Sequence, residues 1–233
     1  MTCLEEYQFR FFTDEQERRD LKEAIENIIR ETRNRQINTI IVFGASGQPV
    51  ASLFKEAWSV LHPREEVPKF YALGLLYQKQ KLRDLFRGGK GLEQLHSFLE
   101  KRIPSLVDRK NEKMLLLDDF AETGSTIRRV KERFSTLGFR DITTAALFAS
   151  SPEHVDFVGR IRSLRDFPLK RGPSFYDQRL PAIYNLKLLQ GIRILGGRNR
   201  DEARRAVSSE RRKFFNKRDL IRHELKRIAR EAK

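Results

Sequence analysis

Short apolar runs alternate with amphipathic helical patterns along this chain, and this alternation restricts its fold more than any other feature. Ile37 to Phe43 (INTIIVF) and Met114 to Leu117 (MLLL) are typical of strands that are buried on both faces. Further strands are predicted over Lys69 to Leu76 and Asp141 to Phe148. Strands separated by helices predict an α/β fold, with a mainly parallel sheet flanked by helices.

Helices are predicted over 14–34, 50–61, 92–103 and 125–137. In the first of these helices, Thr13 and Gln16 fit a capping box. Its apolar residues have the spacing of a helix face that packs on a core: Leu21, Ala24, Ile25, Ile28 and Ile29. Because ligands bind at the carboxyl ends of the strands in such sheets, we expect the functional site in the turns that follow the strands.

Positive charge is concentrated at the end of the chain. The 233 residues carry a formal charge of +15, and residues 198–233, with 14 basic and 6 acidic residues, account for +8 of it. We therefore divide the chain into an α/β domain, 1–197, and a basic helical tail, 198–233. A helix predicted from Ser209 to Arg230 has one apolar stripe: Phe214, Ile221, Leu225 and Ile228. This stripe indicates a helix that docks on the core or a partner subunit, or one that presents a basic face to DNA or RNA.

Several classes of protein are disfavoured by composition. No apolar run approaches the roughly 20 residues of a membrane span, and the first residues lack a long apolar signal segment. The single cysteine, Cys3, excludes an intramolecular disulfide and fits a reducing compartment. We expect a cytoplasmic protein that forms a homodimer and has no membrane partner.

Residues 114–126 (MLLLDDFAETGST) contain the most informative pattern. A buried strand leads to two adjacent acids, Asp118 and Asp119, and a short turn then begins a helix. Backbone N–H groups, hydroxyl groups and a helix N-terminus together form a phosphate cradle, which Gly124 allows a ligand to approach closely. Paired acids beside such a cradle suit sugar hydroxyls or a hydrated Mg²⁺. The sequence therefore predicts a site for a sugar 5-phosphate with vicinal hydroxyls.

This segment resembles the motif with which type I phosphoribosyltransferases bind phosphoribosyl pyrophosphate (PRPP): four apolar residues, two acids and, after three further residues, Thr-Gly-x-Thr. The departure is Ala121, which is smaller than usual. The resemblance covers roughly residues 37–159. It implies a type I phosphoribosyltransferase-like fold, Mg²⁺ as cofactor, and transfer of phosphoribosyl from PRPP to a nucleobase-like acceptor with release of pyrophosphate.

The resemblance also implies roles for individual residues. Asp118 and Asp119 would meet the ribose hydroxyls and, largely through these hydroxyls or water, the metal. Glu122 stands where the 6-oxopurine branch has an aspartate proposed as general base; the alternative is an acid favoured by the helix dipole. The 5-phosphate would be bound by Thr123, Gly124, Ser125 and Thr126.

Two further segments extend the resemblance. In the turn after the first strand, Ala45, Ser46 and Gly47 would hold the pyrophosphate. The basic, glycine-containing segment 77–91 would be a catalytic loop that closes over PRPP, or else a solvated surface loop.

Specificity for the acceptor is less well defined. Phe157 and Val158 resemble residues that line the purine pocket of the hypoxanthine-guanine branch, although Phe157 is also a candidate for a strand core residue. That branch binds the 6-oxo group with a lysine, and Thr143 stands approximately at its position.

Two functions are therefore weighed. The complete acid pair and the Thr-Gly-Ser-Thr turn favour an enzyme. The missing lysine and the charge of +15 favour a non-catalytic regulator or effector that senses PRPP or a nucleotide and binds DNA or RNA through its basic surface. We prefer the enzyme.

Overall fold

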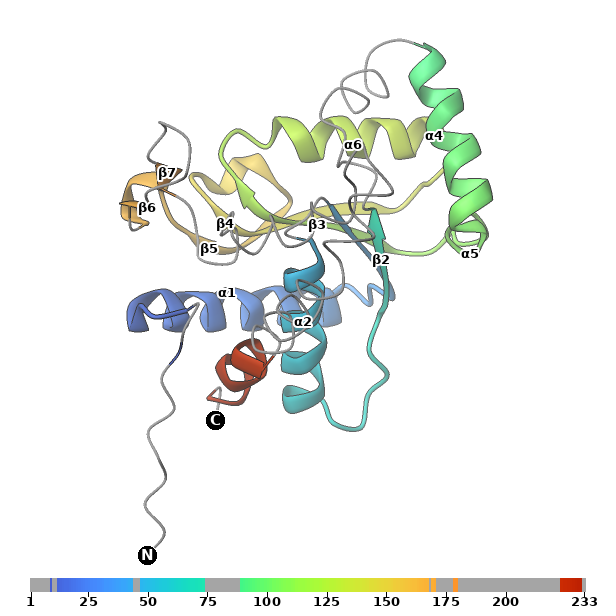
Figure 1. Ribbon diagram of the computed structural model, residues 1–233. Coiled ribbons are helices and arrows are strands. Elements are labelled where there is room, and N and C mark those ends of the chain that lie inside the picture. The colour runs from blue at the N-terminus through green and yellow to red at the C-terminus, as the bar shows by residue number, and fades with distance from the viewer. Residues whose placement is uncertain are drawn as a thin grey trace, which may run out of the picture.

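The computed structural model describes Phe9 and residues 12–43, 47–73, 89–167, 169–170, 178–179 and 223–231 (Figure 1). It confirms an α/β fold built on a five-stranded, all-parallel sheet with the strand order β2-β1-β3-β4-β5. The strands are β1 (Thr39–Phe43), β2 (Lys69–Leu73), β3 (Met114–Ala121), β4 (Ile142–Ala149) and β5 (Phe157–Ile161). A separate antiparallel pair consists of β6 (Leu169–Lys170) and β7 (Gln178–Arg179).

Helices cover both faces of the sheet (Figure 1). One face carries α1 (Glu15–Asn34), α2 (Gly47–Leu61) and a helix at 223–230, and the other carries α4 (Gly89–Arg102), α5 (Pro104–Val107) and α6 (Ser125–Thr136). Short 3₁₀ helices are η2 (Pro152–His154) and η3 (Leu164–Asp166). Within the described residues, no helix is both long and apolar enough to cross a membrane.

The strand order explains this distribution of the helices. The chain passes from β1 to β2 in one direction across the sheet, and from β3 to β4 in the opposite direction. Since such crossovers are right-handed, connections that run in opposite directions place their helices on opposite faces. The direction reverses between β1 and β3, and a reversal of this kind leaves a crevice at the carboxyl ends of the two strands.

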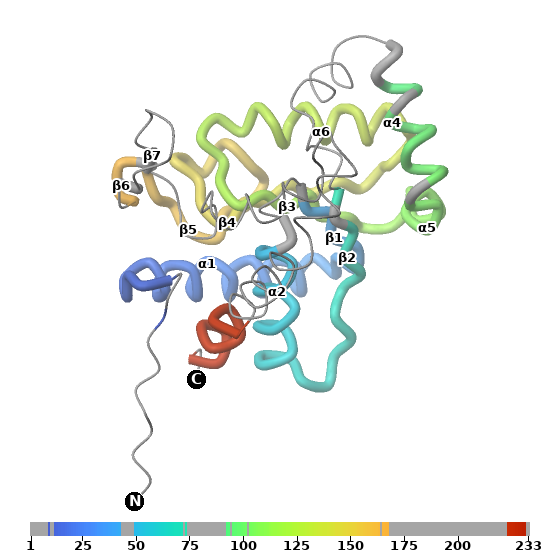
Figure 2. The backbone as a smooth tube through the Cα atoms, in the orientation of Figure 1, coloured from blue at the N-terminus to red at the C-terminus, as the bar shows by residue number. Residues whose placement is uncertain are grey.

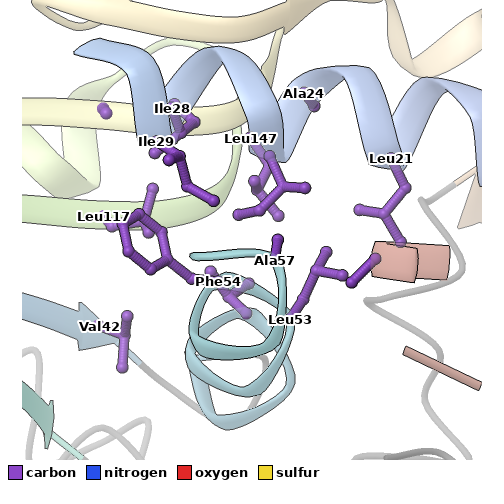
Figure 3. Packing of buried hydrophobic residues seen from close by; sticks show 14 of the residues in the cluster. Leu21, Ala24, Ile28, Ile29, Val42, Leu53, Phe54, Ala57, Leu117 and Leu147 are labelled. Atoms are coloured by element: carbon purple, nitrogen blue, oxygen red, sulfur yellow. The ribbon is translucent and has the colours of Figure 1, made fainter. Parts of the chain in front are cut away.

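A hydrophobic cluster on each face holds the layers together. On one face, the predicted apolar stripe of α1 is buried, as expected, and packs against α2 and the sheet (Figure 3). On the other face, Ile127, Val130 and Phe134 of α6 pack with side chains of α4 and α5. Each large side chain buried in this way contributes about 1.5–3 kcal/mol relative to exposure. These two clusters thus hold the helices against the strands whose carboxyl ends are expected to carry the functional site.

Two local predictions are corrected by the structure. The N-terminal helix is capped by Asp14, not by a capping box of Thr13 and Gln16: the Asp14 carboxylate accepts a hydrogen bond from Glu17 N–H at 2.7 Å. Strand β3 does not end at Leu117 but continues through both acids to Ala121. It remains extended because β4 pairs with it along this length.

Residues 223–230, the part of the predicted tail helix that the structure describes, form a helix that docks on the core beside α1 and α2 (Figure 2). Leu225 and Ile228 are buried in the same cluster as the α1 stripe. Glu224 is also buried, and its Oε2 accepts a hydrogen bond from Phe12 N–H at 3.1 Å. The other two residues of the predicted stripe, Phe214 and Ile221, lie outside the described residues.

Candidate functional site

The two predicted acids lie in the carboxyl half of β3, next to β1, where the order of the strands in the sheet reverses. Asp119 is only 4% exposed, and Asp118 is half-buried. Asp119 N–H donates to Asp118 Oδ1 at 2.9 Å. Burial raises the pKa of the Asp118 carboxyl above its usual value, and the hydrogen bonds with Asp119 offset this effect only in part. A perturbed acid at a ligand-binding edge is characteristic of functional sites.

Residues 122–126 form the turn from β3 into α6. The Thr123 hydroxyl donates to Ser125 Oγ at 3.1 Å, and the Arg128 guanidinium donates to the Thr123 carbonyl at 3.1 Å. Ser125 and Thr126, the first residues of α6, are exposed; residue 124 has no side chain to cap the helix, but Ser125 N–H donates to the Thr123 hydroxyl at 3.4 Å. The first N–H groups of a helix lack partners within it and carry partial positive charge. This turn can therefore bind an anion.

Gly124 is required here for two reasons that the sequence did not show. Its φ of +63° lies in the left-handed region, which disfavours residues with a side chain. A Cβ at this position would also lie only 2.2 Å from the carbonyl oxygen of His154. The main chain at His154 therefore leaves no room for a side chain at Gly124. The sequence predicted a different reason for glycine here, namely close approach by a phosphate.

His154 is a neighbour of the site that sequence reasoning missed. Its ring Nδ1 lies 3.4 Å from Ser150 Oγ and 3.5 Å from the carbonyl oxygen of Ala121, the last residue of β3. The Ser150 hydroxyl donates to the carbonyl of Glu122 at 2.6 Å, and the Glu122 side chain is exposed. The one available signal was that His154 follows a predicted strand, at the edge where ligands bind.

The predicted acceptor residues lie elsewhere on the sheet. Phe157 is buried in the α1 cluster, with the Arg35 guanidinium carbon 5.1 Å from its ring centre, as expected for a strand core residue. Val158 is half-buried and pairs with Ala146, two strands from β3. Thr143 lies near the amino end of β4, so it is not placed to contact a ligand at the carboxyl edge.

The predicted pyrophosphate turn lies largely outside the described residues. Ala45 and Ser46 are not among the described residues, and neither are residues 77–88 of the predicted catalytic loop. Gly47 is the first residue of α2. Because β1 and β3 are parallel neighbours in the sheet, the carboxyl end of β1 lies beside the part of β3 that leads into the acid pair.

The donor set suits only an indirectly bound metal. Among the described residues, no group of three or more acidic, histidine or cysteine side chains could hold a metal ion by itself. Mg²⁺ usually keeps several waters and binds through one or two carboxylates together with substrate phosphates. The pair Asp118 and Asp119 fits that mode.

Compared with known proteins, the chain matches no family model and no curated protein sequence. Its chemistry is therefore inferred from the site itself. The acid pair can accept hydrogen bonds from hydroxyl groups, and the adjacent turn can donate hydrogen bonds to phosphate oxygens. Together they suit a phosphorylated molecule with free hydroxyls.

Proposed function

We propose that this protein has a type I phosphoribosyltransferase-like fold, binds Mg-PRPP at the carboxyl edge of β1 and β3, and transfers the phosphoribosyl group to a nitrogenous, nucleobase-like acceptor. The observation that carries the proposal is that an acid pair and an exposed helix N-terminus follow one another on a single strand-turn-helix unit at the switch point of the sheet. The resemblance of residues 114–126 to the PRPP motif supports it.

In this function the two parts of the unit have separate tasks. Asp118 and Asp119 accept hydrogen bonds from the ribose hydroxyls, and residues 123–126 donate to the 5-phosphate. Fixing both ends of the sugar positions C1 for attack by the acceptor nitrogen. Mg²⁺, when bound with PRPP, neutralises negative charge on the pyrophosphate.

Two measurements test the proposal. Calorimetric titration with Mg-PRPP, and competition by ribose 5-phosphate, test the binding site. A panel of purine and pyrimidine bases, each supplied with Mg-PRPP and followed by pyrophosphate release, tests the transfer. We expect saturable binding and release with at least one base. A protein that binds neither PRPP nor ribose 5-phosphate would refute the proposal.

A second candidate function, a PRPP- or nucleotide-sensing regulator that binds DNA or RNA, is favoured by the charge of +15. Because residues 223–230 dock through Leu225 and Ile228, this helix can offer only its outer side, where Arg230 is exposed; Lys226 is also exposed but pairs with Glu56 at 3.2 Å. Each phosphate contact changes the slope of log affinity against log salt by about −0.9 on duplex DNA.

A gel-shift salt series on the wild type and on Arg230→Gln tests this candidate. A regulator should show a steep slope that becomes shallower in the variant, together with PRPP binding and no pyrophosphate release. Absence of binding to DNA and RNA at low salt rejects it.

A further inference from the structure

The main chain at the end of β3 is held from one side by a single residue, Ser150, which directly follows β4. Ser150 N–H donates to the Ala121 carbonyl at 3.2 Å, and the Ser150 hydroxyl donates to the Glu122 carbonyl at 2.6 Å. Two consecutive carbonyls therefore point toward the β4 side of the sheet. In a regular strand, consecutive carbonyls point in opposite directions, so the Ser150 hydroxyl stabilises a local departure from the strand.

The direction of these carbonyls determines the direction of two N–H groups. A peptide unit is planar and trans, so its N–H points opposite to its C=O. The N–H groups of Glu122 and Thr123 belong to the same peptide units as the two carbonyls, and both therefore point away from Ser150. Neither N–H group donates to an acceptor among the described residues. Two adjacent N–H groups that point the same way form a concave site for an anion, called a nest.

The nest opens on the β1 side of β3. Strand β4 pairs with β3 as far as Ala121, whereas the pairing of β1 with β3 in the described residues ends at Leu117. The two N–H groups thus lie beyond the paired part of β1, between the acid pair and the first turn of α6, where the strand order reverses. The connection after β4 packs against the turn a second time, through the main chain of His154 at Gly124.

We propose that Ser150 is a positioning residue for the phosphate site, and that it holds the N–H groups of Glu122 and Thr123 as a pair that binds an oxygen of the 5-phosphate. This inference rests on the proposed function and extends the phosphate site from residues 123–126 to residues 122–126. Without the Ser150 hydroxyl, the Glu122 carbonyl loses its hydrogen bond and the peptide between Glu122 and Thr123 is free to rotate. The two donors are then no longer preorganised for the ligand.

The test compares Ser150→Ala, which removes the hydroxyl, with Ser150→Thr, which keeps it. Ser151→Ala is the matched control, because the Ser151 hydroxyl donates to the Glu153 carboxylate instead of to the turn. Calorimetry on the full chain measures the affinity for ribose 5-phosphate and, separately, for Mg-pyrophosphate, which has no 5-phosphate. We expect Ser150→Ala to bind ribose 5-phosphate about tenfold more weakly, because a hydrogen bond to a charged group contributes at least about that factor. Its affinity for Mg-pyrophosphate, and both affinities of Ser150→Thr and Ser151→Ala, should match those of the wild type.

Amide NMR on the same proteins reports on the two donors directly. In the wild type, ribose 5-phosphate should move the proton signals of Glu122 N–H and Thr123 N–H downfield, because both groups then donate to a charged oxygen. These shifts should be smaller in Ser150→Ala.

Several results would overturn the role of Ser150. They are an unchanged affinity of Ser150→Ala for ribose 5-phosphate, an equal loss for Mg-pyrophosphate, an equal loss in Ser150→Thr, and wild-type amide signals at Glu122 and Thr123 that do not respond to ribose 5-phosphate. Each of these leaves PRPP binding by the wild type intact. A wild type that binds neither PRPP nor ribose 5-phosphate refutes the proposed function, and this inference with it.

Discussion

Asp156 and Asp118 belong to the same sheet, yet their pKa values are shifted in opposite directions. Asp156, directly before β5, accepts hydrogen bonds from the N–H and the hydroxyl of Thr144 at 2.7 and 2.9 Å, and from Lys131 Nζ at 3.0 Å. Partial burial raises its pKa, but these donors lower it by more. At Asp118, in the carboxyl half of β3, burial raises the pKa and the neighbouring group is another acid. The fold favours the charged form of Asp156 and disfavours that of Asp118.

The glycines at the two ends of α6 differ in a similar way. Gly138 follows α6 on the way to β4, with φ of +92°, and a Cβ there would meet only the Lys110 side chain, at 3.7 Å. Gly124 precedes α6, and a Cβ there would collide with the His154 main chain at 2.2 Å. Backbone conformation alone requires glycine at Gly138, whereas Gly124 is also held by a tight contact.

Asp156 and Gly138, which precede β5 and β4, are thus accommodated by their surroundings, whereas Asp118 and Gly124, at the carboxyl end of β3, are held in less favourable arrangements. Proteins retain arrangements of that kind where binding or catalysis needs them. Substitutions of these acids and glycines test whether the two ends of the strands differ in this way.

The largest effect is expected at the acid pair. In Asp118→Asn/Asp119→Asn, the loss of two charge-assisted contacts, each worth about 1.5–3 kcal/mol, should weaken Mg-PRPP binding by about 3–6 kcal/mol in calorimetry. Asp156→Asn is the matched control and should bind normally. Wild-type affinity in the double variant would remove the acid pair from the site.

The glycine comparison predicts a smaller loss, this time in stability. Gly138→Ala should lose about 1–2 kcal/mol, because alanine is disfavoured at positive φ. Gly124→Ala should lose more, about 2–4 kcal/mol, because the His154 main chain must also move. Urea denaturation of both variants measures the difference, and equal losses would show that the contact at Gly124 adds nothing.

Asp156→Asn should destabilise the protein by about 1–2 kcal/mol near neutral pH, a value reduced because the side chain is partly exposed. The folded-state pKa of Asp156 lies below its unfolded value, so its contribution is full above the unfolded pKa of about 3.9 and is lost as pH falls from there through the folded pKa. The gap between wild type and variant should therefore narrow below about pH 4. A gap that is constant across pH would argue against the ion pair.

The smallest effect has the opposite sign. Asp118→Asn alone should stabilise the protein by about 0.5–1.5 kcal/mol near neutral pH, because it removes a half-buried carboxyl whose charged form the fold disfavours. The folded-state pKa of Asp118 lies above its unfolded value, so the wild type loses stability as pH rises from the unfolded toward the folded pKa. The gain should vanish below about pH 4. Destabilisation of this variant at neutral pH would place Asp118 with Asp156 as a structural acid.

Most elements around the site could be predicted from the sequence, because each is encoded by a local pattern. The apolar run at 37–43 and the stripe from Leu21 to Ile29 reflect burial of a strand and of one helix face, and both periodicities are visible without the fold. The acids at Asp118 and Asp119 were found in the same way, directly after an apolar run. Their place within β3 was not, because only pairing with β4 keeps polar residues extended there.

The sequence by itself thus determined the α/β class, the acid pair and the turn at Gly124, since each depends on residues that are close together in the chain. Only the tertiary structure decided the strand order that makes β1 and β3 neighbours, and the contact between His154 and Gly124, thirty residues apart. Such contacts depend on how the connection between β4 and β5 passes over the sheet, and no local periodicity carries that information.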